Sequence, residues 1–433
     1  MLVYTISMKL THIYRIKPSP EQVAIMETWL EMLRRHFNYA LGQRFDWLRR
    51  TRSQADRCSL VSEPIGDIPE RFPSYNVQAG ELKQTKQLFP AYKEIQAEVQ
   101  QQNLKRLEIA WDRWIKPDKS GKKAGRPRFK KKGEMRSFTF PRINCPKAGV
   151  NRIEHGVITL SKIGSMPVVM HRPFPVGFTL KTATIVKKAD GWYVAICVED
   201  DSVPTPKPID EMRSAVGVDL GLKTFLFTSD GEFVDVQQHY RRTQKHLARQ
   251  QKRLAKKREG SKKAEKQKQR IARIHQRIGR KREDFHYNVA HKLVKTYDLI
   301  AVEDLNIKGL AKTKLAKSIY DVAWGKFLTI LEAVALRSGV HFVKVNPHST
   351  TIDCSGCGTK VPKTLSVRLH QCPKCELELD RDENAAINIL NKGLSAVGLT
   401  VPAYRRLSGC APNEVGMPNS DVRKLTLYSQ ELA

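Results

Sequence analysis

The chain has 433 residues, and its 76 lysines and arginines against 44 aspartates and glutamates give a formal net charge of +32. An apolar content of 40% is that of a folded protein, and the length suits roughly two to four domains. No long apolar run supports a membrane protein, so we expect no membrane partner and favour a polyanion, above all nucleic acid.

The cysteines indicate the compartment. Four of the eight cluster at 354–375 and the others are scattered, which is not the even framework of a disulfide-rich secreted protein. The start of the chain also lacks a basic segment followed by an apolar core. We therefore expect a protein of the reducing cytoplasm.

The first quarter of the chain is predicted to be one strand followed by helices. Residues 8–16 alternate between apolar and polar side chains, as a strand does. Ser19 is a candidate N-cap for a helix whose apolar residues recur at helical spacing. A second amphipathic helix is predicted over 91–115. Residues 17–115 are thus expected to form a small helical unit.

The next part is predicted to be mostly β. The Gly- and Lys-rich segment 117–133 is expected to be a loop, and 204–211 a linker. Strands are predicted between them at 137–142, 157–163 and 177–199. The last of these contains Ala189-Asp190-Gly191, a hairpin turn.

After the linker the pattern changes to short strands and a long basic helical stretch. Strands are predicted at 215–220, 223–229 and 232–236. Residues 239–283 follow with helical spacing and one break near 259–261, and 241–282 contain 19 lysines and arginines. A solvated charged face is the ordinary explanation of such a run, but this excess favours a hairpin that follows phosphates. A strand at 297–305, a helix at 323–339 and a strand at 340–347 complete the alternation.

Two C-x2-C pairs, Cys354/Cys357 and Cys372/Cys375, are separated by 14 residues. Each pair can turn on a tight knuckle that directs both thiolates to one point, and two knuckles make a tetrahedral sulfur site that suits zinc. A redox dithiol or buried core cysteines would explain one pair alone. Two pairs in this spacing predict one structural zinc ion.

Three acidic residues lie at the ends of predicted elements: Asp219 within an apolar strand, Glu303 at the end of "LIAVE", and Asp382 at a helix start. Each alone has an ordinary explanation, namely a buried hydrogen bond, a solvated strand end and a helix cap. Hairpin strands followed by alternating strand and helix are, however, the plan of an RNase H-like fold. Such a trio binds two Mg²⁺ ions about 3.5–4 Å apart, one activating water and the other stabilising the leaving 3′-oxygen.

The segments "GVDLGLK", "AVEDL" and "DRDENAAINIL", the last just after the double C-x2-C finger, resemble the TnpB proteins of bacterial insertion sequences. These are compact RNA-guided DNA endonucleases, similar to the ancestors of type V CRISPR effectors. The resemblance implies a RuvC-like triad of Asp219, Glu303 and Asp382 with two Mg²⁺ ions. It also implies one zinc ion held by Cys354, Cys357, Cys372 and Cys375.

The resemblance further implies a multidomain α/β protein in which a RuvC-like nuclease domain carries an inserted zinc ribbon, accompanied by a β-barrel wedge domain and a helical recognition domain. The wedge domain is expected to consist of a first strand at 1–17 and a barrel at 119–205, with the helical recognition domain at 18–118 between them. The nuclease domain is expected at 206–350, including the basic hairpin 239–283, and its last segment at 379–397. The zinc finger is expected at 351–378, and a disordered tail at 398–433.

Its implied partners are a guide RNA from the transposon end and a double-stranded DNA target, cut beside a short transposon-associated motif. Sequence choice would come mainly from base pairing with the guide. We expect a monomer with its RNA, in the cytoplasm and at the bacterial nucleoid.

Contacts to nucleic acid are expected from both N-terminal parts. By their places in "SYNVQAGELK", "EVQQQNLKRLE" and "SFTFP", Tyr75, Gln101 and Thr139 resemble residues that contact the adjacent motif. Ordinary surface or packing roles are the alternative for these three. In the basic segment "GRPRFKKK" we expect contacts from Arg126, Arg128 and Lys130.

Three other classes of protein are weighed against this one. A transposase that cuts and joins DNA shares the acidic trio, but a zinc finger just before the third acid disfavours it. A nuclease-inactive RNA-guided repressor would be expected to lack one of the acids, and all three are present. An actin-like ATPase would explain "GVDLGLKT" but needs later glycine-rich nucleotide motifs and a different charge.

Overall fold

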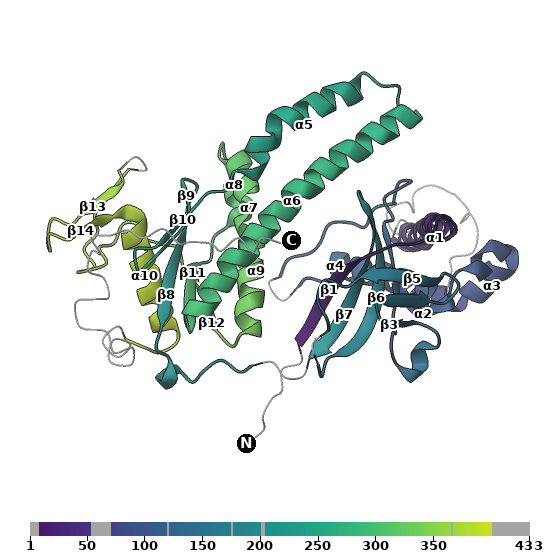
Figure 1. The fold of residues 1–433 in the computed structure, drawn as a ribbon, viewed down its shortest axis with the longest axis horizontal. Coiled ribbons are helices and arrows are strands. Elements are labelled where there is room, and N and C mark those ends of the chain that lie inside the picture. Colours follow the sequence, from purple (N-terminus) through teal and green to yellow (C-terminus); the bar gives the residue numbers. More distant parts are fainter. Residues whose placement is uncertain are drawn as a thin grey trace, which may run out of the picture. The chain divides into compact units, whose positions relative to one another are not determined.

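The structure is a computed structural model, and it describes residues 8–52, 71–118, 121–174, 176–200, 204–364 and 367–400 (Figure 1). The chain divides into two compact units, Met1–Ser202 and Val203–Ala433. Each unit is mixed α/β, as the sequence predicts. The predicted tail falls outside the described residues from 401 onward.

The first unit begins with the strand β1 (Met8–Ile16), followed by the long helix α1 (Pro20–Arg52), in agreement with the prediction. Ser19 caps α1 in a reciprocal arrangement with Gln22. The Gln22 backbone N–H donates to Ser19 Oγ at 3.3 Å, and the Ser19 N–H donates to Gln22 Oε1 at 2.9 Å. Two otherwise unpaired N–H groups are thereby satisfied at the point where strand becomes helix.

Seven strands form the sheet of this unit, in the order β2-β6-β7-β1-β5-β4-β3. β1 pairs antiparallel with β7 over its whole length and with β5 at its end, so the first strand lies in the middle of the later ones. The later strands are β2 (Ser137–Phe140), β3 (Arg152–Glu154), β4 (Val157–Leu160), β5 (Gly164–Val169), β6 (Thr179–Lys188) and β7 (Gly191–Asp200). The predicted hairpin turn joins β6 to β7.

The remaining helices of this unit are α2 (Tyr75–Gly80), α3 (Leu82–Leu88) and α4 (Ala97–Ile115). The prediction of a helix from residue 91 was wrong at its start. Pro90–Glu94 form a 3₁₀ turn, and Ile95 and Gln96 are extended before α4 begins. A buried arginine, Arg44, ties α1 to α4 through Glu108 at 2.6 Å, and it also bonds Gln78 of α2.

The second unit contains a five-stranded sheet in the order β10-β9-β8-β11-β12. β8 (Ala215–Leu220), β9 (Thr224–Thr228) and β10 (Phe233–Asp235) pair antiparallel. β11 (Leu299–Glu303) lies parallel to β8 on one side and to β12 (His341–Val345) on the other. Three hairpin strands are therefore extended by two parallel ones, the pattern that the element order predicts.

Helices cover both faces of this sheet (Figure 1). Val216 and Val218 of β8 pack toward α6 (Lys262–Thr296) and α9 (Trp324–Arg337). The side chains at the alternate positions of these strands, such as Ala215 and Ala301, point to the other face and pack against α10 (Arg381–Ala396). The alternation of side chains along a strand therefore assigns one face to α10.

The basic stretch forms a helical hairpin of α5 (His239–Ala255) and α6, with the predicted break at Gly260, whose φ is +75°. The predicted end at 283 was wrong, because α6 continues to Thr296. Its last turns bury Phe285, Val289 and Leu293 against the sheet, so packing extends the helix beyond the charged stretch.

Short elements complete the second unit: α7 (Ile307–Leu310), α8 (Ala316–Val322), and the two-stranded ribbon of β13 (Leu369–Gln371) and β14 (Glu378–Asp380). Within the parts of the chain that the structure describes, no helix has both the length and the apolar character needed to cross a membrane.

Candidate active site, metal centre and nucleic-acid surfaces

Two of the predicted acids lie at the ends of neighbouring parallel strands. In the register of β8 and β11, Val218 is opposite Val302, and the next residues are Asp219 and Glu303. Adjacent strands lie about 4.8 Å apart. Asp219 is four residues after Ala215, and Glu303 is two residues after Ala301. Because side chains alternate along a strand, both acids point to the same face as these alanines, which is the face that α10 covers.

The third acid reaches this edge because α10 lies unusually close to the sheet. A Cβ at Gly217 of β8 would lie 2.0 Å from the Ala386 carbonyl oxygen, and one at Gly393 of α10 would lie 2.4 Å from the Ala301 Cβ. Only glycine permits this contact. Asp382 is thus held in the first turn of a helix that is seated directly on β8 and β11.

Asp382 does not cap that helix. A capping role is the ordinary explanation that the sequence alone offers for an acid at this position. The cap is Asp380, whose Oδ1 accepts a hydrogen bond from the Asp382 backbone N–H at 2.7 Å. The Asp382 carboxylate is therefore free of the capping role.

The negative charges of Glu303 and Asp382 both act on the carboxyl group of Asp219. Burial, reinforced by the negative charges of Glu303 and Asp382, raises the pKa of Asp219 to about 8. Burial also raises the pKa of Glu303 and that of Asp382. A buried carboxyl that two other carboxyls repel accepts a proton or a cation readily, since either relieves the repulsion on it.

The structure also gives these acids partners that the sequence analysis missed. Arg368 Nη1 lies 3.1 and 3.0 Å from the two carboxylate oxygens of Asp382. The hydroxyl of Thr350 lies 2.5 Å from Glu303 Oε1, and the charge of Lys392 acts to lower the pKa of Glu303. No fixed spacing relates these residues to the acids, so no sequence pattern identifies them.

The four predicted zinc ligands come together in the ribbon. Their Sγ atoms all lie within 4.8 Å of one another, with 3.6 Å between Cys354 and Cys375 and 3.6 Å between Cys357 and Cys372. A tetrahedral zinc site with Zn–S bonds of about 2.3 Å requires sulfur atoms roughly 3.7 Å apart. Within the described ranges, these cysteines are the group whose ligand atoms are gathered as metal ligands are, and they can bind a zinc ion.

The two knuckles repeat the same backbone geometry. The Gly358 N–H donates to the Cys354 carbonyl at 2.8 Å, and the Glu376 N–H donates to the Cys372 carbonyl at 3.0 Å. Gly358 and Glu376 both have left-handed backbones, with φ of +73° and +56°. The site is therefore shaped by its backbone before any ion binds.

In the first unit, Tyr75 and Gln101 lie around one surface of α4. The ammonium of Lys105 lies 5.5 Å from the centre of the Tyr75 ring, and Gln101 is exposed one helical turn from Lys105. A pocket of about 330 Å³ opens here, with Tyr75, Lys105 and Glu108 in its wall.

Thr139 lies apart from that pocket, on β2. Its hydroxyl accepts a hydrogen bond from Arg106 of α4 at 2.6 Å and lies 2.9 Å from the hydroxyl of Thr184. These contacts satisfy the side chain within the protein.

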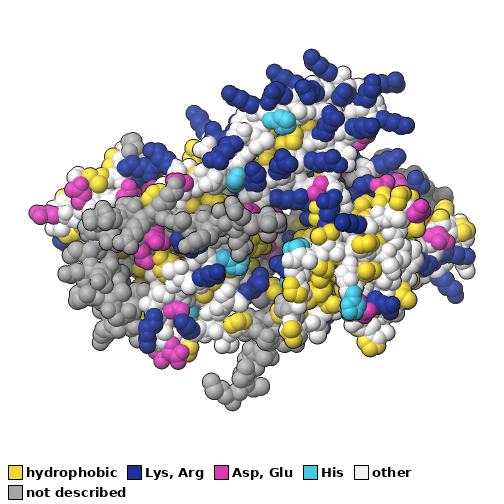
Figure 2. All heavy atoms as spheres, in the orientation of Figure 1, with side chains coloured by type: hydrophobic (Ala, Val, Ile, Leu, Met, Phe, Trp, Pro, Cys, Tyr) yellow, Lys and Arg dark blue, Asp and Glu magenta, His cyan; other side chains and the backbone are white. Residues whose placement is uncertain are grey.

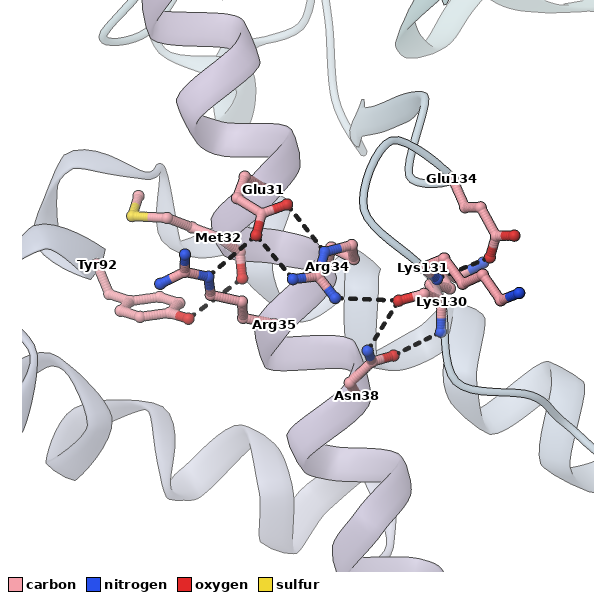
Figure 3. A network of polar contacts seen from close by, with 9 residues as sticks. All are labelled: Glu31, Met32, Arg34, Arg35, Asn38, Tyr92, Lys130, Lys131 and Glu134. Carbon is pink, nitrogen blue, oxygen red and sulfur yellow. Dashed lines mark hydrogen bonds and ion pairs between the residues drawn. The ribbon is translucent and has the colours of Figure 1, made fainter. Parts of the chain in front are cut away.

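The basic loop that contains Arg126, Arg128 and Lys130 packs along α1 (Figure 3). Arg34 and Asn38 donate to the Lys130 carbonyl at 3.0 Å each, and the Asn38 Oδ1 accepts from the Lys130 N–H at 2.8 Å. The Arg126 guanidinium stacks 4.0 Å above the ring of Phe45, and Arg128 is exposed. The loop is thus fixed by its backbone, with cationic side chains on its surface.

The other basic surface is the hairpin of α5 and α6, where lysines and arginines crowd the visible face (Figure 2). Its base is held by Asp321 of α8, a buried residue. The Asp321 carboxylate accepts the backbone N–H groups of Tyr240 and Arg241 at 2.8 and 3.1 Å, which caps α5. The direction of the hairpin within its unit is therefore fixed at its root.

Three family models match this chain. A model described as "Probable transposase" matches residues 195–314, one described as "Cas12f1-like, TNB domain" matches 324–389, and one described as "Helix-turn-helix domain" matches 8–53. The last match covers β1 and α1, a strand and one helix.

Curated relatives decide the family. A protein of Streptomyces pristinaespiralis named "Putative RNA-guided DNA endonuclease" is 30% identical over 394 residues, which cover 88% of this chain and 89% of the relative. The chain belongs to the TnpB family. The family expected from the sequence motifs is therefore confirmed. InsQ of Escherichia coli K12, which has the same description, is 30% identical over 68% of this chain and 73% of its own.

More distant relatives include a protein of Allomeiothermus silvanus named "CRISPR-associated DNA-binding protein Cas12m", 34% identical over 26% of this chain and 23% of its own. Among solved structures, a Cas12f1–sgRNA–target DNA complex matches with 13% identity and a TM-score of 0.32, covering 89% of this TnpB-family chain and 99% of the solved one.

Proposed function

We propose that this TnpB-family protein is an RNA-guided, Mg²⁺-dependent DNA endonuclease. The observation that carries the proposal is that Asp219 and Glu303 follow the paired residues Val218 and Val302 on neighbouring strands, and that the charges of Glu303 and Asp382 both act on Asp219. We assign the second unit to the RNase H-like class of RuvC nucleases, on the strand order of its sheet.

The donor set fits Mg²⁺. The three side chains offer hard oxygen ligands, and two of them stand on rigid strands. A divalent cation would relieve the repulsion that Glu303 and Asp382 exert on Asp219. When bound, a pair of Mg²⁺ ions would supply an activated water and charge stabilisation at the leaving 3′-oxygen. Asp219, Glu303 and Asp382 would be the side chains that hold them.

Binding of nucleic acid is supported by the charge of the hairpin. It has 19 basic residues between 241 and 282 and only two acidic ones, Glu259 and Glu265. A surface of this kind neutralises phosphates irrespective of sequence. The relatives named as RNA-guided DNA endonucleases support a guide RNA as the source of sequence choice, with double-stranded DNA as the target.

We further propose that the first unit recognises a short motif beside the target. Tyr75 and Gln101 would contact it from the surface near Lys105, and Thr139 would take part from β2. Arg126, Arg128 and Lys130 would bind the phosphate backbone. The division into wedge, recognition, nuclease and zinc-ribbon parts remains a proposal of the same kind.

A nuclease-inactive DNA-binding protein is the second candidate. It is favoured by one observation: both carboxylate oxygens of Asp382 are engaged by Arg368, so this acid must leave or share that contact to bind Mg²⁺. The Cas12m relative, named as a DNA-binding protein, belongs to the same group of similar sequences.

The proposal is tested by purifying the protein with its RNA, sequencing that RNA, and challenging the complex with a plasmid library that has randomised flanks beside the matching target. We expect one discrete RNA species and Mg²⁺-dependent cleavage beside one short motif. Binding of the matched target without cleavage would favour the DNA-binding candidate. Absence of any bound RNA would contradict both.

A further inference from the structure

In the loop between β12 and the zinc ribbon, the polar side chain of Thr350 is buried although the loop begins with exposed residues. Thr350 has only 2% of its surface accessible, whereas Asn346, Pro347 and His348 are exposed. A hydroxyl buried in an otherwise solvated loop needs a partner. Its Oγ1 lies 2.5 Å from Glu303 Oε1 and 3.1 Å from the Pro347 carbonyl oxygen.

The hydroxyl hydrogen can serve only one of these two acceptors at a time. An ionised carboxylate is the stronger acceptor, and the distance to it is the shorter. Thr350 therefore donates to Glu303 when that side chain is ionised. Glu303 Oε2 has no hydrogen-bond partner in the described part of the chain, so this contact fixes one carboxylate oxygen and leaves the other open.

The loop that carries Thr350 is itself held in place by α10. Asn388 Nδ2 donates to the carbonyl oxygens of Thr350 at 2.9 Å and Asp353 at 2.7 Å. Asn384 bonds the Asp353 carbonyl through Nδ2 and the Ser355 N–H through Oδ1, both at 2.9 Å.

Lys392 continues the same row, donating to the carbonyl oxygen of His348 at 2.5 Å. Asn384, Asn388 and Lys392 are four residues apart, so they form one stripe along α10. Each of them holds loop backbone rather than a loop side chain. The helix that begins beside Asp382 therefore also determines where Thr350 stands.

We propose that Thr350 is a positioning residue for the acidic site: its hydroxyl orients Glu303 so that the free oxygen, Oε2, faces Asp219 and Asp382. The inference rests on the proposed function, because it assumes that these acids bind a divalent cation. A glutamate at a strand end otherwise samples several rotamers, and fixing it beforehand removes that entropic cost from metal binding.

The test compares three variants of the full chain. Thr350→Val keeps the branched shape and removes the hydroxyl, whereas Thr350→Ser keeps the hydroxyl. Thr351→Val is the matched control, because the Thr351 hydroxyl forms no hydrogen bond within the described residues. Binding of Mn²⁺ is measured by electron paramagnetic resonance, with Asp219→Ala as the background, and cleavage by the RNA complex is measured across Mg²⁺ concentrations.

We expect Thr350→Val to weaken Mn²⁺ binding and to raise the half-saturating Mg²⁺ concentration about tenfold, as loss of a hydrogen bond to a charged group does. Saturating Mg²⁺ should restore most of the cleavage rate. Thr350→Ser and Thr351→Val should stay within about twofold of the parent protein.

Normal Mn²⁺ binding and normal Mg²⁺ dependence in a folded Thr350→Val protein would overturn the inference. A loss that Thr350→Ser does not rescue would also overturn it, since it would indicate packing alone. If Thr350→Val does not fold, Thr350→Ala serves in its place. Failure of the proposed function gives a different result, namely cleavage or specific Mn²⁺ binding that survives Asp219→Ala.

Discussion

The four cysteines that can bind zinc come from one short segment, 354–375, whereas the three acids of the proposed nuclease site come from positions 219, 303 and 382. The cysteines are arranged by two local turns with the same backbone geometry. The acids are arranged by the register of two strands and by a helix that two glycines allow onto the sheet. The first site therefore depends on local chain geometry, and the second depends on the whole second unit.

The largest effect is expected from a substitution in the four-cysteine site. Cys372→Ser should lower the zinc content from one ion per chain to nearly none and destabilise the ribbon, because structural zinc contributes about 10–16 kcal/mol to folding of such modules. Zinc is measured by elemental analysis after dialysis. Cys145→Ser, at an exposed cysteine of the first unit, is the control. A Cys372→Ser protein that keeps one zinc ion would refute the four-sulfur site.

The acidic site should be disrupted by a substitution at a residue that is not itself one of the three acids. Gly217→Ala places a Cβ 2.0 Å from the Ala386 carbonyl oxygen, so α10 must move away from β8. We expect a loss of about 2–3 kcal/mol in the free energy of unfolding, with loss of cleavage. Denaturant unfolding measures the first effect.

Gly279→Ala in α6 is the matched control, since a Cβ there meets no atom within 4 Å. That change should be neutral or stabilising by up to about 1 kcal/mol. Equal stability of the two variants would contradict the close seating of α10 on the sheet.

Metal binding at the acidic site should depend on pH through Asp219. Because the pKa of Asp219 is raised to about 8, this carboxyl is largely protonated at pH 7 in the absence of metal. Mg²⁺ binds the ionised form, so its affinity should rise between about pH 6 and pH 8, with release of nearly one proton at pH 7.

Calorimetry in two buffers of different ionisation enthalpy measures that proton. In Asp219→Asn the release should fall toward zero. Proton release that is unchanged by this substitution would show that another group accounts for it.

The smallest effect is expected on zinc affinity, from a substitution of Thr359, which contacts one of the cysteines. Hydrogen bonds from Thr359 lower the pKa of Cys357 to about 6, and its hydroxyl lies 3.3 Å from Cys357 Sγ. Thr359→Val should raise that pKa, so zinc affinity should drop a few-fold at pH 6 and hardly at all at pH 8. Competition with a chelating dye at the two pH values measures the difference, and an equal drop at both would contradict this cause.

The contrast between the sites also explains what the sequence could predict. Four cysteines in two close pairs determine a local geometry, so their spacing alone predicts a zinc site. Asp219, Glu303 and Asp382 were inferred from the order of elements and from the family resemblance, because no spacing brings them together. Strand register and the parity of side chains decide which face they share.

Other features could not be predicted because they depend on how distant segments pack. Thr350 and Arg368 reach the acids only through the path of the loop and the ribbon. Likewise, α6 continues past its charged stretch because its last turns find a hydrophobic partner. In both cases the deciding contact lies far away in the sequence.

The central claim is that Asp219 is part of a metal-dependent nuclease site, and it is tested most directly by cleavage of a matched plasmid by the RNA complex of Asp219→Ala. We predict that this protein retains its RNA and binds the target DNA, while cleavage falls at least a thousandfold to the limit of detection, by the order of magnitude expected when a group essential to the chemical step is removed. Cleavage at the rate of the parent protein, by a homogeneous Asp219→Ala preparation, would contradict the account.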